Sequence, residues 1–118
     1  MNVIMNLTIK RRWFDMILSG EKREEYRDVD NSQVKNAWES IYNYEYGEYY
    51  VMVLRNGYRM SSRALAIQVY GIILRSGKDS IYPEWGEPTD RDHLVIILGD
   101  VLKRGTYADV KDWLEKRD

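Results

Sequence analysis

The densest group of chemically capable side chains in this sequence lies between Gly20 and Arg27, in the run Gly-Glu-Lys-Arg-Glu-Glu-Tyr-Arg. Glu25 and Arg27 stand two positions apart, so they share one face if the segment is a strand. Arginine presents a fork of donors that suits phosphate or guanine. Glutamate can accept from an exocyclic amine or take a proton from a nucleophile. Together with Lys22, these residues are predicted to grip a phosphate or the polar edge of a base.

The same run also has an interpretation that involves no ligand. Charged residues are common on edge strands, where cross-strand ion pairs add little stability. Lys10 raises the same choice, because it ends a predicted strand next to a helix start, whose free N–H groups favour anions. We treat Lys10 as a second ligand residue, and the alternative is a solvated basic turn with Arg11 and Arg12.

The elements that must position these residues follow from hydrophobic spacing. Alternation predicts a strand over 3–10, and an apolar stripe predicts a helix over 12–19. Gly20 can close that helix in a left-handed conformation, and a polar strand over 22–29 follows. Further strands are expected over 49–55, 63–74 and 94–98, the second with a bulge at Gly71 and the last with an extension at 101–102. A helix is expected from 31 or 32 to 41, and another over 107–116 with Thr106 as its cap.

Strands outnumber helices, which predicts the α+β class, with a mixed or largely antiparallel sheet that curls into a β-barrel flanked by short helices. No repeat, low-complexity tract or linker divides the 118 residues, so we expect a single domain over 1–118. The first residues carry no basic leader, and no apolar run is long enough for a membrane span. We therefore expect no membrane association, and a cytoplasmic location agrees with the absence of cysteine.

The composition excludes several chemistries. Without cysteine, disulfides and thiolate metal sites are impossible. His93 is the single histidine, which makes a poor transition-metal site, and we interpret it as structural or exposed. The sequence contains no glycine-rich nucleotide loop and no serine nucleophile elbow. We expect no cofactor and no metal.

The net charge of −1 conceals a strong local asymmetry. Residues 51–78 carry five basic side chains and no acidic one, whereas residues 79–100 carry six acidic side chains and one basic. If residues 1–27 and 51–78 lie together in the fold, they form a basic patch that could meet phosphate. The alternative is that the arginines of the second segment are solvated charges at strand ends and in loops: Arg55, Arg59, Arg63 and Arg75.

Ten tyrosines are present, and five of them cluster, at positions 42, 44, 46, 49 and 50. Aromatic faces stack on unpaired bases, which would suit a nucleic-acid surface. The acidic side chains of Glu39, Glu45 and Glu48 are interleaved with the cluster and would repel a phosphate backbone. We therefore favour a packing and hydrogen-bonding role for these tyrosines.

Gly20, Lys22, Glu25 and Arg27 reproduce the pattern G-x-K-x-x-E-x-R, which resembles the signature of the ASCH family in the PUA-like superfold. The preceding strand and helix, and the closing run 93–99, are also similar to such domains. The resemblance covers most of residues 5–103 and leaves the last helix unmatched. It implies a barrel with a cleft beside the signature and ligands that are RNA or nucleotides. Tyr58 and Trp85, in loops expected to rim that cleft, become candidate ligand residues.

Three functions remain open from the sequence. The first is a module that binds RNA or a nucleotide through six residues: Lys10, Lys22, Glu25, Arg27, Tyr58 and Trp85. The second is a small metal-independent hydrolase of RNA or of a modified nucleoside, with Lys22 and Glu25 as catalytic residues. The branch of the family that hydrolyses acetylated cytidine would have its nucleophilic threonine where this chain has Glu25, which argues against that mechanism. The third is a protein-interaction domain.

Overall fold

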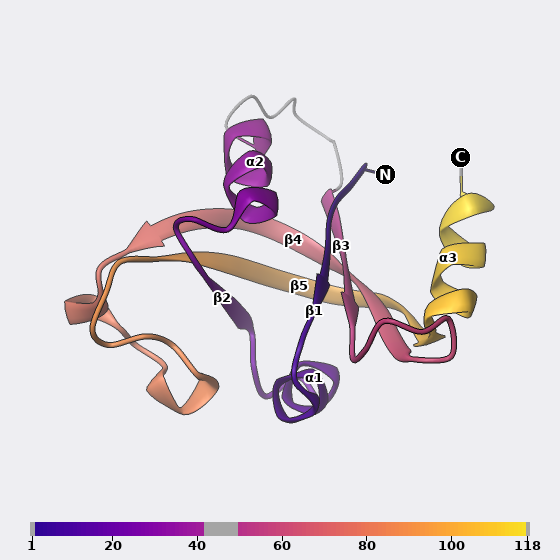
Figure 1. Ribbon diagram of the computed structural model, residues 1–118, viewed down its shortest axis with the longest axis horizontal. Helices are drawn as coiled ribbons and strands as arrows, with labels where there is room; N and C mark the ends of the chain where they lie inside the picture. The colour runs from indigo at the N-terminus through magenta and orange to yellow at the C-terminus, as the bar shows by residue number, and fades with distance from the viewer. Residues whose placement is uncertain (1, 42–49, 118) are drawn as a thin grey trace.

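The computed structural model describes residues 2–41 and 50–117, and one curved sheet runs through this part of the chain. Its strands are β1 (Asn2–Thr8), β2 (Glu24–Asp28), β3 (Tyr50–Arg55), β4 (Arg63–Arg75) and β5 (His93–Thr106). Their spatial order is β1-β3-β4-β5-β2. β1 and β3 are parallel, and the other neighbouring pairs are antiparallel. The long ribbon of β4 and β5 crosses the whole molecule (Figure 1).

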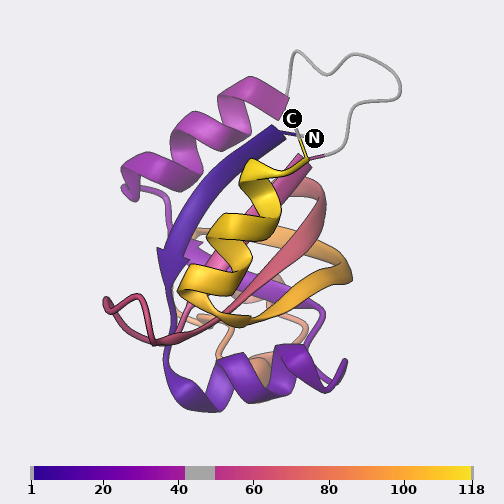
Figure 2. The ribbon, with the colours of Figure 1, turned by 90° about the vertical axis from the view of Figure 1, so that its right-hand side faces the viewer.

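The three helices of the described residues are α1 (Arg11–Leu18), α2 (Ser32–Ile41) and α3 (Tyr107–Glu115). α1 and α2 lie at opposite ends of β1, and α3 stands apart from them beside the end of the β4–β5 ribbon where β5 stops (Figure 1, Figure 2). α3 begins with a reciprocal cap: the Thr106 hydroxyl accepts from the Asp109 amide at 3.2 Å, and the Asp109 carboxylate accepts from the Thr106 amide at 3.0 Å. The predicted cap at Thr106 is confirmed.

The two faces of β3 and β4 are buried against different helices, because successive side chains of a strand point to opposite sides. Met52 and Leu54 belong to the larger core, together with Phe14 of α1 and Val34 of α2. The alternate residues of β3 and β4 point to the other side of the sheet and pack with Val110 of α3: Val51, Val53, Ala64 and Ala66. The near-continuous apolar runs of these strands thus reflect burial on both faces.

The predicted helices and strands are present, with small changes at their ends. The register of β4 against β5 shifts between Val69 and Gly71, so the irregularity expected at Gly71, a bulge or a bend, is present. The expected extension of the last strand to 101–102 is confirmed, and β5 continues beyond it to Thr106, because register shifts between β4 and β5 accommodate the interruption at Gly99. The α+β class with a mixed sheet is confirmed.

The sheet is not closed. β1 and β2 occupy its two edges and do not pair with each other, so the barrel stays a prediction. The edges nevertheless approach at one end, where the Arg27 side chain of β2 donates to the Thr8 carbonyl of β1 at 2.8 Å. This approach creates the cleft described below. Among the described residues, none of the helices has the length and apolar character that crossing a membrane requires.

Candidate functional site

A cleft of about 570 Å³ opens where the ends of β1 and β2 meet the loops that follow β3 and precede β5. Five of the six predicted ligand residues line it: Lys10, Glu25, Arg27, Tyr58 and Trp85. These residues come from four separate parts of the chain, and the fold brings them together. Lys22 is the sixth, and it does not belong to the cleft wall.

Glu25 and Arg27 form the polar wall of the cleft, on one face of β2. Glu25 Oε2 lies 3.1 Å from Arg27 Nη2, and the same Arg27 nitrogen donates to the Thr8 carbonyl. Glu25 Oε1 accepts from the Tyr26 amide at 3.0 Å. The Glu25 side chain is only 6% exposed and that of Arg27 is 22% exposed. A carboxylate and a guanidinium, both held in place, therefore line the cleft.

Lys22 lies beneath the cleft. Its backbone amide donates to the Met16 carbonyl at 3.0 Å, which folds the chain back under α1 after Gly20. Its Nζ donates to the Trp85 carbonyl at 2.7 Å and lies 3.4 Å from Glu25 Oε1. The side chain is completely buried. Burial lowers the pKa of Lys22, and the carboxylate of Glu25 opposes this shift only in part.

Aromatic rings surround the Lys22 ammonium and separate it from the cleft. The Nζ atom lies 4.3 Å from the centroid of the Tyr26 ring and 5.3 Å from the Trp13 ring. Lys22 is thus connected to the cleft through Glu25 and Trp85, and it does not share the cavity that Arg27 lines. Its position supports these two residues.

Three predicted residues stand at the rim. Lys10 is exposed where β1 ends, just before α1. Tyr58 is 83% exposed, and its hydroxyl lies 3.5 Å from the Thr8 hydroxyl. Trp85 is partly buried and stacks on Tyr82, with ring centroids 3.9 Å apart and an angle of 14° between the planes. A cation and two aromatic faces thus border the polar wall.

Several lining residues are not among the ligand residues predicted from the sequence. Trp13 lies on the apolar stripe of α1 and was assigned to packing, but it is partly exposed and reaches the cleft. Asn56 ties the loop after β3 to β1, because its Nδ2 donates to the Ile9 carbonyl at 2.9 Å. Gly86 has φ +86°, and a Cβ there would lie 2.8 Å from the Trp13 indole. The sequence indicates a turn at Asn56-Gly57, but the contacts that bring these residues to the cleft join distant segments, and local spacing does not predict them.

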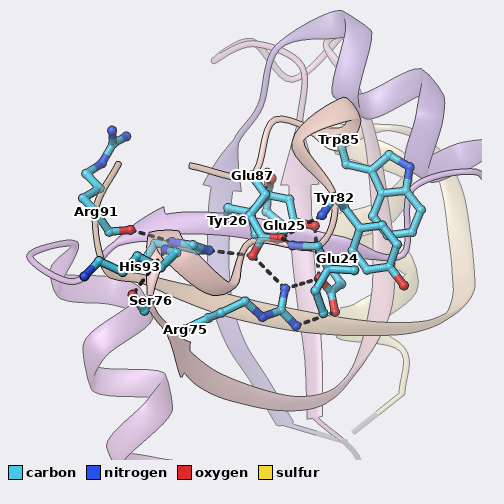
Figure 3. A network of polar contacts seen from close by, with 12 residues as sticks. Glu24, Glu25, Tyr26, Arg75, Ser76, Tyr82, Trp85, Glu87, Arg91 and His93 are labelled. Carbon is cyan, nitrogen blue, oxygen red and sulfur yellow. Dashed lines mark hydrogen bonds and ion pairs between the residues drawn. The ribbon is translucent and has the colours of Figure 1, made fainter. Parts of the chain in front are cut away.

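A buried ionic cluster lies next to the cleft (Figure 3). Glu87 Oε2 lies 2.6 Å from His93 Nε2 and 2.7 Å from Arg75 Nη1. Arg75 also contacts both oxygens of Glu24, at 2.9 and 3.3 Å, and Glu24 accepts from the Tyr26 hydroxyl at 3.0 Å. His93 is fully buried, in agreement with its structural interpretation. The sequence placed Glu87 in a loop, and it gave no sign that this carboxylate is buried.

The cluster shifts the ionisation of its members. Burial on its own would raise the pKa of Glu87, but hydrogen bonds from His93, from the Tyr82 and Ile81 amides and from Arg75 outweigh it and hold the pKa at about 2. Burial and the neighbouring Glu24 carboxylate raise the pKa of the Tyr26 phenol. Hydrogen bonds to Glu24 and Glu87 raise the pKa of Arg75. Glu87 and Arg75 therefore stay charged across the neutral pH range.

The basic segment 51–78 is only partly available to a ligand. β1 and β3 pair, so this segment does lie beside residues 1–27, which is the condition for a basic patch. However, Arg75 belongs to the buried cluster, Arg63 donates to Asp15 at 2.7 Å, and Arg55 lies 3.6 Å from the centroid of the Tyr107 ring. Arg59, in the loop after β3, is exposed and fits the interpretation of these arginines as solvated charges.

Of the clustered tyrosines, Tyr50 is buried in β3, in agreement with a packing role. The other four lie outside the described residues. Within the part of the chain that the structure describes, no group of three or more histidine or acidic residues is arranged to hold a metal ion.

The cleft can therefore offer hydrogen-bond acceptors from Glu25, donors and positive charge from Arg27 and Lys10, and flat aromatic faces. Comparison of the chain with protein-family models, with curated proteins and with solved structures finds no match in any of the three. The resemblance to the ASCH signature thus stands on the residues at 20–27 and their context.

Proposed function

We propose that this chain is an RNA- or nucleotide-binding domain of the ASCH type, with a PUA-like barrel arrangement, and that the cleft beside residues 20–27 is its binding site. The observation that carries the proposal is the joint presence of cations and aromatic faces around one cavity. Arg27 and Lys10 supply positive charge, and Trp13, Tyr58 and Trp85 supply the faces.

A nucleotide has a flat base and an anionic phosphate, and each part finds a partner in this cleft. A base stacked on an aromatic side chain gains about 1–3 kcal/mol, largely independent of its identity. The Arg27 guanidinium can donate to phosphate or to a base oxygen. Glu25 can accept from an amino group of the base, because its Oε2 faces only Arg27 among the described residues. The walls are held by hydrogen bonds before a ligand arrives, which reduces the entropic cost of binding.

The hydrolase hypothesis has one observation in its favour, the lowered pKa of Lys22. The same burial argues against direct catalysis, since the Lys22 ammonium contacts the Trp85 carbonyl and aromatic rings and does not line the cleft. A catalytic role for Lys22 would require residues 81–87 to move away. We therefore place binding first and keep hydrolysis of RNA or of a modified nucleoside as the second candidate.

The proposal is tested by fluorescence-anisotropy titration of a short labelled single-stranded RNA at low and at physiological salt. We expect salt-sensitive binding by the wild type, and about tenfold weaker binding by Arg27→Gln. Arg91→Gln is the matched control, because Arg91 is an exposed arginine that pairs with Asp28 away from the cleft. If Arg27→Gln and Arg91→Gln weakened RNA binding equally, the RNA would be attracted by the overall positive charge and not by the cleft. Absence of binding to this RNA and to free mononucleotides would refute the proposal.

A further inference from the structure

One wall of the cleft is built from a short loop. Residues 81–87, here called the strap, supply Trp85 and Gly86 to the cleft and contain only a single 3₁₀ turn, Pro83–Trp85. Short loops of this kind are usually among the more mobile parts of a fold. A wall that stacks on a ligand needs a fixed orientation, so the contacts that hold the strap determine how well the cleft is formed.

The carboxylate of Glu87 joins the two ends of the strap. Its Oε1 accepts from the Ile81 amide at 2.7 Å and from the Tyr82 amide at 2.9 Å. The Glu87 amide in turn donates to the Tyr82 carbonyl at 3.3 Å. The side chain of Glu87 has no exposed surface. The last residue of the strap thus bonds back to the first two, without help from solvent.

The other oxygen of Glu87 anchors the strap to the sheet (Figure 3). Oε2 lies 2.7 Å from Arg75 Nη1 at the end of β4 and 2.6 Å from His93 Nε2 at the start of β5. Arg75 continues to Glu24 of β2. One carboxylate therefore connects the strap to two strands directly and to a third through Arg75.

The connection reaches the cleft through Tyr82 and Trp85. The Tyr82 amide is held by Glu87, the Tyr82 ring stacks on the Trp85 ring, and the Trp85 carbonyl accepts from Lys22. Glu87 itself does not line the cleft. The strap is therefore the direct route by which Glu87 can affect a ligand in the cleft. The longer route, through Arg75 and Glu24 to Tyr26, is the one that the control variant below disturbs.

We propose that Glu87 is a positioning residue of the cleft: it fixes the strap so that the Trp85 face stands ready for a base. The expected effect on ligand affinity rests on the proposed function, whereas the effect on the Trp85 side chain does not. Glu87→Gln is the sharpest variant. A carboxamide has one acceptor oxygen and a donating NH₂ group, so its NH₂ must face either the two strap amides or the Arg75 guanidinium.

The control variant is Glu24→Gln. It alters the same buried cluster, where Glu24 pairs with Arg75, but among the described residues the hydrogen bonds of Glu24 go to Arg75 and Tyr26 and not to the strap. Two readouts are compared on folded protein: affinity for a short labelled single-stranded RNA, and the ¹H–¹⁵N signals of the indole N–H groups of Trp85 and Trp113. Trp113 lies on α3, beside the other core, and serves as the internal reference.

We expect Glu87→Gln to weaken RNA binding at least about tenfold and to move the Trp85 indole signal, with the Trp113 signal unchanged. Glu24→Gln should leave affinity within about threefold of the wild type. An unmoved Trp85 signal in Glu87→Gln would overturn the proposal, and so would equal weakening by the two variants. If the wild type binds no RNA, the proposed function fails and the Trp85 signal alone decides whether Glu87 positions the wall.

A measurement on the wild type covers the case in which Glu87→Gln does not fold. Amide hydrogen exchange should show the Ile81 and Tyr82 amides protected to the degree of strand amides, because Glu87 accepts from both. The Glu84 amide, at the exposed tip of the strap, is expected to exchange fast. Exchange of the Ile81 and Tyr82 amides as fast as that of Glu84 would overturn the proposal.

Discussion

Replacing Lys22 with methionine removes the buried ammonium beneath the cleft and keeps most of the volume of its aliphatic chain. Removal of one partner from a buried ion pair usually costs about 3–5 kcal/mol, because the other charge is left uncompensated. Here Glu25 keeps two donors, Arg27 Nη2 at 3.1 Å and the Tyr26 amide at 3.0 Å. The lowered pKa of Lys22 also shows that burial of the ammonium is itself unfavourable. We therefore expect the lower end of the range, a loss of about 3 kcal/mol in the free energy of unfolding.

The assay is urea unfolding followed by far-UV circular dichroism, with the midpoint and slope fitted for each protein. Lys116→Met is the matched control, because Lys116 is an exposed lysine that pairs with Asp112 on α3. It should unfold at the wild-type urea concentration. A Lys22→Met protein as stable as the wild type within about 0.5 kcal/mol would refute the reasoning, because surface substitutions have effects of that size. Lys22 would then be solvated, and its contact with Trp85 would not contribute to the free energy of unfolding.

Three further predictions concern the surroundings of the cleft. The pKa of Glu87 lies at about 2, below its ordinary 4.5, so the unfolded chain takes up the proton before the folded chain as the pH falls. The stabilisation from Glu87 is complete above about pH 4.5 and should decline by about 3 kcal/mol on acidification to pH 2. In urea titrations at each pH, Glu87→Gln should lose this dependence on pH. Gly86→Ala combines a positive φ with a collision against the Trp13 indole and should lower the free energy of unfolding by about 2–3 kcal/mol in thermal unfolding. Gly20→Ala, at φ +85° with open space around it, should lower it by about 1 kcal/mol. Equal losses would contradict the close approach of Gly86 to Trp13. Tyr58→Ala should leave the melting temperature unchanged and weaken RNA binding by about 1–3 kcal/mol in anisotropy titrations. Tyr70 is exposed on β4 outside the cleft, so Tyr70→Ala should not change RNA binding. Weaker binding by Tyr70→Ala than by Tyr58→Ala would place the ligand elsewhere.

Much of the fold could be predicted from the sequence, because its signals are local. The stripe of Phe14 and Ile17 fixes a helix and its buried face, and Thr106 fixes the start of α3. Gly71 announces an irregularity in β4, and one is present. The extension of β5 past Gly99 to 101–102 was predicted, but its full length to Thr106 was not, since only its pairing with β4 carries the strand onward.

The candidate site was predictable in its residue types but less so in its arrangement. Glu25 and Arg27 are two positions apart on one strand, so they point to the same face, and local spacing is enough to predict this. Whether Lys22 faces the ligand depends on the Trp85 carbonyl, which lies 63 residues further along the chain. The pairing of Glu87 with Arg75 and His93 depends on tertiary contacts too, and these convert loop charges into buried ones.

The measurement that tests the central claim most directly is a ¹H–¹⁵N titration of the labelled protein with a short single-stranded RNA. The account predicts that signals shift at the cleft, above all the amides of Gly57 and Gly86 and the indoles of Trp13 and Trp85. Signals of α3, including the Trp113 indole, should stay in place. Shifts centred on α3 with the cleft signals unmoved would contradict the assignment of the cleft as the binding site.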